Sequence, residues 1–331
     1  MAGLPIFTQP PIARRKNEGK FGIVLPVIGA NVCAADGGSG QDWLKTANIA
    51  DHKTNYSGVF VFQYGNHVET SSIAHVVEPD GEYEKLESLD GPKREVIRHH
   101  GQAWCYWNNK VFPVGNLYGD RRFPLLLPDP LASLRQNYQV KELGMDRVAG
   151  YNTRVVLYQS RDNLRYSYKI WVDVISGLLL KSAVLNEKNQ IAEQYAFTEL
   201  KLGNDADHSW LADSTPDSTK QVEIPPAPAI KSGWVVDGLP RGFIKAMEIL
   251  RPMHGKHSPV IQLVFSDGLS AISVFIETAD ADEDDNEALT SRGAVNLYRK
   301  VVDNHLYNVV GEVPPKAVMQ VLDSIRFNGK K

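Results

Sequence analysis

The chain has 331 residues, of which 43% are hydrophobic and 23% are charged, and its formal net charge at pH 7 is -3. This length allows two domains and a sizeable core. The composition is that of a globular protein, and no basic field is present, so nucleic acid is excluded as an expected partner.

The first 34 residues have the pattern of a secretory signal peptide. Four basic residues and one acid precede the apolar run Phe21–Val32, which is too short to span a bilayer as a helix, and small residues follow it. We expect cleavage after Ala34, which leaves Cys105 as the single cysteine of the mature chain. A disordered leader on a cytosolic protein stays open as the alternative, because short apolar runs are ambiguous.

Strand patterns dominate the next part of the chain. After a short helix at Asp42–Asp51, we expect some ten strands, with one or two helical turns at Leu131–Asn137. The expected strands are 56–64, 73–78, three runs within 83–107, 138–143, 154–159, 166–173, 178–185 and 190–201. So many strands with so little helix predict a mainly β fold built on a large antiparallel sheet, strongly curved or half-closed.

The stretch Tyr83–Trp107 does not fit a sheet that packs on a single core. Turn residues break it into three runs, and large aromatic residues mix with charges on both faces. Because one core requires clean alternation, we expect a concave side that is only partly filled. We expect six aromatic residues to line a cavity there, and the alternative is that these six fill an ordinary core. The candidate cavity residues are Phe60, Phe62, Trp104, Tyr106, Tyr166 and Tyr168.

Residues 112–130 differ in composition from the strands around them, because they contain four prolines and two glycines. Proline is excluded from central strands, so a long loop is expected there. A lid over a binding site and a plain loop that covers the core are both open. The apolar tip of this loop consists of Phe123, Leu125, Leu126 and Leu127.

A linker and a second domain complete the predicted organisation. Residues 204–233 are rich in Asp, Ser, Thr and Pro, which predicts a linker between a large β domain at 42–203 and a small α+β domain at 234–327. The small domain has five strand candidates, at 243–250, 260–265, 271–278, 295–302 and 306–310. Its last helix is expected to start at Pro314-Pro315 and to bury Val318, Val321, Leu322 and Ile325.

The sequence contains no catalytic or cofactor motif that we can identify. A nucleophile elbow, a zinc-protease motif, a P-loop and a dinucleotide fingerprint are all missing, so an enzyme is the weaker class and no cofactor or metal is expected. His99-His100 lack a third ligand and are expected on a solvated surface. The acidic run Asp280–Glu287 lacks the glycine and the final glutamate of an EF-hand, and is expected to be a solvated loop.

Several segments together make the chain similar to the RseB/MucB family. The similarity runs in order through nearly all of the expected mature chain, and it departs from the family in the long leader and the acidic insert at 280–287. The segments are NYSGVFVFQYG (55–65), LDGPKREVIR (89–98), RVAGY (147–151), RDNLRYSYKIWVD (161–173), GLLLKS (177–182), FSDGLSAISVFIE (265–277), RGAVNLYRK (292–300) and VVGEVPPKAV (309–318).

This resemblance implies a periplasmic, non-enzymatic regulator of the envelope-stress sigma factor. Such a protein binds the periplasmic part of an RseA/MucA-type anti-sigma factor and shields it from the first regulated cleavage. The resemblance also implies a large domain similar to the LolA/LolB lipoprotein carriers, a half-open barrel around a helix, and release of the partner by lipid or lipopolysaccharide. The six aromatic residues are therefore expected to accept acyl chains.

A periplasmic carrier of lipids or lipoproteins is the alternative, since a domain similar to LolA could hold the cavity alone. The second domain favours a regulator, because a simple carrier does not need it. The identity of the ligand, the residues that contact the partner and the formation of a homo-oligomer stay open.

Overall fold

The computed structural model describes residues 42–99, 102–107, 110–114, 134–211, 229–251, 258–279 and 287–329. They belong to one compact unit, Gln41–Lys331. The strands form an 11-stranded sheet, a 6-stranded sheet and a short pair, β12 (Trp234–Val236) with β19 (Ile325–Phe327). The predicted mainly β fold with a large and a small antiparallel sheet is confirmed. Within the described ranges, no helix has the length and apolar character needed to cross a membrane.

The large sheet consists of two meanders that meet in the middle. β1 pairs with β11, so β6 and β7 are the two edges of the sheet. The first meander contains β1 (Tyr56–Tyr64), β2 (His67–Glu78), β3 (Gly81–Ser88), β4 (Arg94–His99), β5 (Gln102–Trp107) and β6 (Lys110–Val114). The second contains β7 (Tyr138–Val148), β8 (Tyr151–Ser160), β9 (Ser167–Asp173), β10 (Leu179–Leu185) and β11 (Ile191–Leu202).

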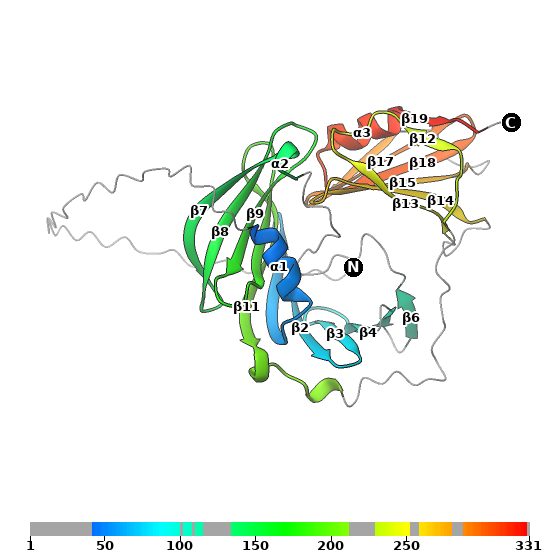
Figure 1. The fold of residues 1–331 in the computed structure, drawn as a ribbon. Coiled ribbons are helices and arrows are strands. Elements are labelled where there is room, and N and C mark those ends of the chain that lie inside the picture. Colours follow the sequence, from blue (N-terminus) through cyan, green and yellow to red (C-terminus); the bar gives the residue numbers. More distant parts are fainter. Residues whose placement is uncertain are drawn as a thin grey trace, which may run out of the picture. The chain divides into compact units, whose positions relative to one another are not determined.

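Helix α1 (Trp43–Asp51) lies against the concave side of this sheet (Figure 1). The helix begins after Asp42, whose carboxylate accepts a hydrogen bond from the Lys45 backbone N–H at 3.2 Å and so caps the first turn. Leu44 and Ala47 are buried in the core cluster that includes Tyr168 of β9. We call the face of the sheet toward α1 the inner face. The predicted half-open arrangement around a helix is confirmed.

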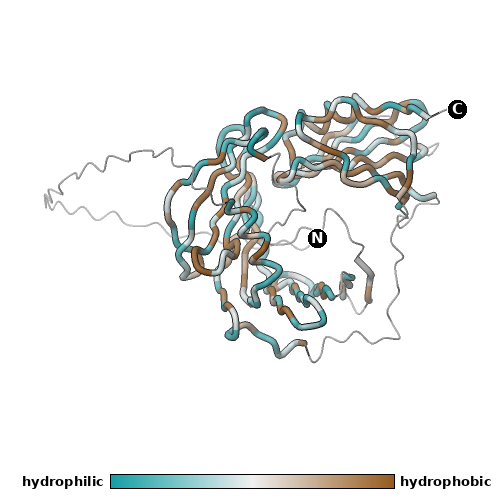
Figure 2. Tube along the Cα trace, viewed as in Figure 1, coloured by the Kyte–Doolittle hydropathy of each residue, from teal (hydrophilic) through white to brown (hydrophobic). Residues whose placement is uncertain are grey.

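Hydrophobic and hydrophilic residues follow one another along the strands of the large sheet (Figure 2), and successive side chains of a strand point to opposite faces. On β9, Ile170 packs in the core cluster beneath α1, whereas the next residue, Trp171, points to the opposite face, where Lys169 and Lys181 lie over its ring. Segment 206–211 covers part of the other face, where Trp210 packs on Ala74 and Val76 of β2. The start of the predicted linker is thus anchored by one buried tryptophan.

The small sheet has the order β13-β14-β15-β18-β17-β16. Its strands are β13 (Ile244–Arg251), β14 (Val260–Ser266), β15 (Ala271–Thr278), β16 (Ala288–Arg292), β17 (Val295–Val302) and β18 (His305–Gly311). Helix α3 (Pro315–Asp323) contacts β17 and β18 and buries Val318, Val321 and Leu322, as predicted. The placement of Ile325 on this helix was wrong, because α3 ends at Asp323 and Ile325 lies in β19.

Other predicted segments are only partly described. The expected helical turns before β7 appear as α2 (Leu134–Asn137), and Pro113 lies in the edge strand β6, a position that tolerates proline. The predicted loop tip, His100 and residues 280–286 lie outside the described residues.

Candidate functional site

Four of the six aromatic residues predicted to form a cavity belong to the inner face. Directly paired residues on antiparallel strands point to the same side of a sheet. Phe62 pairs with Tyr195 and Tyr195 with Ser182, which pairs with Ile170, two residues from Tyr168. Phe60 and Phe62 therefore share the inner face with Tyr166 and Tyr168. Phe60, Tyr166 and Tyr168 are buried, and Phe62 is half-buried.

The other two aromatic residues, Trp104 and Tyr106, belong to the opposite face. Trp104 pairs with Ile97, and the pairing continues through Lys85 and Ala74 to Ser57, which points away from the side of Tyr56 and Phe60. Trp104 is buried and Tyr106 is half-buried. The structure thus brings four of the predicted residues onto one face and separates the remaining two. Their role in lipid binding stays a prediction.

The inner face next to Tyr168 is almost completely filled. The cavity there has a volume of about 20 Å³ and is bordered by Leu44, Tyr168, Tyr195 and, from loops next to the small sheet, Leu269 and Glu312. This is room for roughly one water molecule, far less than an acyl chain needs. Leu269 and Glu312, which lie in loops next to strands of the small sheet, thus border the inner face beside Tyr168, one of the predicted cavity residues.

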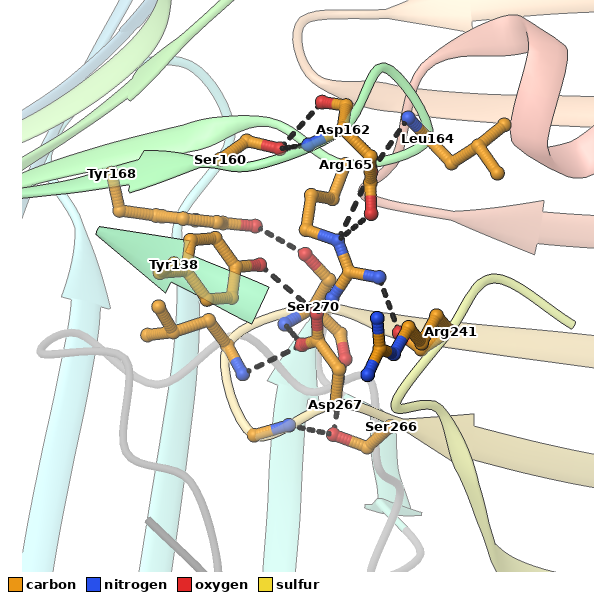
Figure 3. A network of polar contacts seen from close by, with 12 residues as sticks. Tyr138, Ser160, Asp162, Leu164, Arg165, Tyr168, Arg241, Ser266, Asp267 and Ser270 are labelled. Carbon is orange, nitrogen blue, oxygen red and sulfur yellow. Dashed lines mark hydrogen bonds and ion pairs between the residues drawn. The ribbon is translucent and has the colours of Figure 1, made fainter. Parts of the chain in front are cut away.

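A buried polar network joins the two sheets at this place, and we call it the junction (Figure 3). Arg165, in the loop between β8 and β9, forms an ion pair with Asp267, in the loop between β14 and β15, and both side chains have 0% exposure. Arg165 also donates from Nε to Asp162 at 3.0 Å and from Nη2 to the backbone oxygen of Arg241 at 2.5 Å. Burial raises the pKa of the Asp267 carboxyl, although the loop N–H groups and Arg165 act in the opposite direction.

Tyrosine hydroxyl groups extend the junction across the inner face. Tyr138 donates to Asp267 Oδ2 at 3.0 Å, and the hydroxyl groups of Tyr168 and Ser270 lie 2.9 Å apart (Figure 3). Asn296 donates to the hydroxyl of Tyr166 at 3.1 Å. Burial raises the pKa of Tyr168 well above its usual value, so its hydroxyl keeps its proton for hydrogen bonding.

The turn between β16 and β17 makes a further contact with the large sheet. The Ala294 N–H donates to Glu193 Oε2 at 2.9 Å. Arg292 donates from Nε to the hydroxyl of Tyr64 at 2.9 Å and forms an ion pair with Glu69 at 3.1 Å. The turn can approach this closely because Gly293, at φ +60°, has no side chain; a Cβ there would lie 2.6 Å from Glu193 Oε2.

The sequence analysis did not identify the charged residues of the junction. Arg165 lies in a polar loop, where a charged residue gives no sign of burial, and Asp267 lies in a turn whose N–H groups it caps at Leu269 and Ser270. A contact between residues 102 positions apart in the sequence requires the tertiary structure.

Comparison with known proteins identifies related sequences over both sheets. The model of the MucB/RseB N-terminal domain matches residues 39–215, and that of the MucB/RseB C-terminal domain matches residues 228–326. The sigma factor AlgU regulatory protein MucB of Pseudomonas aeruginosa is 32% identical over 304 residues, which cover 89% of this chain and 93% of MucB. The sigma-E factor regulatory protein RseB of Escherichia coli K12 is 26% identical, with 86% and 89% covered.

Solved structures show the same relationship. A crystal structure of MucB in complex with MucA(peri) matches with a TM-score of 0.69 and 31% identity, covering 87% of this chain and 99% of that chain. A crystal structure of MucB matches with a TM-score of 0.61 and 30% identity, covering 86% and 97%.

Proposed function

This chain belongs to the MucB/RseB family of sigma-factor regulatory proteins, which are not enzymes, and on this premise we propose that it binds the periplasmic part of a MucA/RseA-type anti-sigma factor in the periplasm. The match to MucB crystallised with MucA(peri) carries the proposal, because it extends through both sheets and 99% of the MucB chain.

Binding is proposed to shield the anti-sigma factor from regulated proteolysis. A partner segment that orders on binding loses conformational entropy, so it needs a broad surface, which two joined sheets can provide. The test combines the chain from residue 35 onward, the purified periplasmic part of an anti-sigma factor and a DegS-type protease. We expect saturating amounts of the chain to slow cleavage strongly. Cleavage at the unprotected rate would contradict the proposal.

Lipid or lipopolysaccharide is proposed to release the partner by opening the junction. An acyl chain does not fit beside Tyr168 while Leu269, in the loop between β14 and β15, borders a cavity of about 20 Å³. A bound acyl chain would have to displace Asn296, which bonds to Tyr166, and Ser270, which bonds to Tyr168. Ligand binding and the closed junction therefore compete for the same inner-face surface.

The length of the acyl chain gives a quantitative test of this release. Each buried methylene contributes roughly 0.8 kcal/mol, so affinity should rise steeply with chain length. Linkage requires that a ligand that displaces the partner is itself displaced by the partner. Acylated ligands of increasing length are titrated against the preformed complex. Release without dependence on length, or no release at saturation, would contradict lipid gating.

The carrier function is the alternative. It would be favoured if the protein transferred the acylated ligand but bound no anti-sigma factor.

Two neighbouring phenylalanines allow a matched comparison in the same assay. Phe60 is 5% exposed, so Phe60→Ala should cost about 3–5 kcal/mol of stability through lost burial and a cavity. Phe62 is half-buried, so Phe62→Ala should cost less stability and should reduce the affinity for acyl chains more. Unfolding in urea and lipid titration measure the two effects. Equal lipid affinity in wild type and Phe62→Ala would remove Phe62 from the proposed surface.

A further inference from the structure

Two buried asparagines lie at the junction, and their side-chain amides differ in what they bond. Asn296, in β17, is 2% exposed, and its Nδ2 donates to the Tyr166 hydroxyl at 3.1 Å and to the Val313 backbone oxygen at 2.8 Å. Asn137, the last residue of α2, is 4% exposed. Its Nδ2 is buried and has no hydrogen-bond partner among the described residues. One amide is thus bonded across the junction, whereas the other is buried without such a bond.

The amide of Asn137 is covered from the small-sheet side of the junction. Gly242 packs directly on it, because a Cβ at position 242 would overlap the amide. Asn137 precedes Tyr138 in the sequence and Gly242 follows Arg241, and both of these neighbours belong to the junction. Gly242 has φ +84°, so it provides both the left-handed backbone and the close approach. Separation of the two sheets would therefore expose the amide to water.

The backbone at this position does not require an asparagine. Asn137 is not among the described residues with positive φ, the conformation in which asparagine is favoured over most residues. Its backbone oxygen accepts a hydrogen bond from the Arg161 N–H at 3.0 Å, which any residue could do. The backbone therefore gives no reason for a buried amide here.

Closing the junction removes water from the Asn137 N–H groups without replacing the lost hydrogen bonds. A buried polar group without a partner carries its full desolvation penalty, which lowers an equilibrium constant by about five- to 150-fold. An apolar side chain of similar shape avoids this penalty. The bonds of Arg165 with Asp267 and of Tyr168 with Ser270 join the two sides of the closed junction. Asn137 opposes them.

We propose that Asn137 destabilises the closed junction and so sets how readily the two sheets separate. Without this amide the junction opens more rarely, and a ligand that requires the open junction binds more weakly by the same factor. The effect on opening is a property of the free chain, and only its consequence for lipid release rests on the proposed function. Asn137 thus tunes the sensitivity to a ligand without altering the inner-face tyrosines.

Hydrogen exchange of the free chain from residue 35 onward measures the opening of the junction. The reporters are the Leu269 and Ser270 N–H groups, which donate to the buried Asp267 carboxylate. The N–H group of Val309, a fully buried residue in β18, reports on unfolding of the small sheet. The reporters should exchange faster than Val309 in wild type, because the junction opens more often than the sheet unfolds. Equal protection of all three groups would show that the junction does not open separately, which contradicts the proposal.

Three variants separate the effect of the amide from that of its volume. Asn137→Leu replaces the amide by an apolar group of similar shape, and Asn137→Ala removes it without adding volume. Asn296→Leu is the matched control, because the same substitution there removes a bonded amide. We expect the reporters to exchange about five- to 150-fold more slowly in Asn137→Leu, to slow less in Asn137→Ala, which loses packing, and to exchange faster in Asn296→Leu. Exchange at or above the wild-type rate in both Asn137 variants would overturn the proposal.

The titration of acylated ligands against the preformed complex is then repeated with Asn137→Leu. Release of the partner should need more ligand, by the factor found in hydrogen exchange. Slower exchange together with unchanged release would support the role of Asn137 in the junction and contradict the opening of the junction by lipid. The failure of this inference and the failure of lipid gating can therefore be told apart.

Discussion

The carboxyl group of Asp51 makes the stability of the folded chain depend on pH. Its pKa of about 6 in the folded chain, raised first by burial and then by Glu84, lies above its ordinary value of 3.8. A raised carboxyl pKa means that the folded state holds the proton more tightly than the unfolded state. The corresponding stability is fully present below pH 3.8 and is lost as the pH rises through about 6.

Asp51→Asn should therefore stabilise the protein at pH 7. The asparagine cannot ionise, and a shift of this size corresponds to at most about 3 kcal/mol. Unfolding in urea at pH 5, 6 and 7 measures the effect. The advantage of the variant should grow with pH over this range. An advantage of the same size at every pH would show that packing, and not ionisation, is responsible.

A second prediction concerns the stability of the ion pair between Arg165 and Asp267. The pair is fully buried, and each residue is the counter-charge of the other. Arg165→Met leaves the carboxylate without its cation and should cost about 3–5 kcal/mol. Adding Asp267→Asn removes that charge but keeps an oxygen for the Leu269 and Ser270 N–H groups. The double variant should recover much of the loss. If it is no more stable than Arg165→Met, the pair does not act through charge.

Among the structural elements, the turn between β16 and β17 can be tested with a matched glycine. Gly293 at φ +60° and Gly65 at φ +54° both adopt the left-handed conformation, so alanine costs roughly 1–2 kcal/mol at either position. A Cβ at Gly65 meets no atom within 4 Å, whereas one at Gly293 meets Glu193. Gly293→Ala should cost more stability and should increase hydrogen exchange of the Ala294 N–H. Equal losses would show that this turn does not need its close approach.

Strands with regular alternation could be predicted from the sequence, and strands without it could not. Tyr56–Tyr64 alternates aromatic residues with others and forms β1 with the predicted bounds. Ala288–Arg292 forms β16 although all five residues are exposed, so no apolar periodicity marks it. The pair β12 and β19 was also missed, since each has three residues and depends on a partner distant in sequence.

The candidate site was also predictable only in part, because alternation is visible in the sequence but the pairing of strands is not. Alternation placed Phe60 with Phe62 and Tyr166 with Tyr168, and pairing across β11 and β10 brings the two pairs to one face. The face of Trp104 depends on the register of four successive strand pairs, which the sequence does not reveal. His99 was expected on a solvated surface; it is half-buried and stacks on Tyr83.

At the scale of the whole molecule, the small sheet should be necessary for full protection of the anti-sigma factor. A fragment that ends at Leu211 keeps Trp210 on β2 but loses Asp267, so Arg165 has no counter-charge from the small sheet. We expect this fragment to protect the anti-sigma factor less than the chain from residue 35 onward. Cleavage protection is compared at equal folded concentrations, established by circular dichroism. Equal protection by the fragment would exclude a contribution from the small sheet.

The pairing of β1 with β11 has a consequence for the chain as it is exported. Gln63 and Gln194 bond across it at 2.8 Å although they lie 131 positions apart. A chain that enters the periplasm with its N-terminus first can fold β1 against β2 early, but the other side of β1 waits until β11 has also been exported. During that interval β1 presents an unpaired edge, YSGVFVFQY, which has no charged residue to discourage pairing with a second chain. Aggregation during biogenesis should therefore begin at β1, a strand that lies in the middle of the finished sheet.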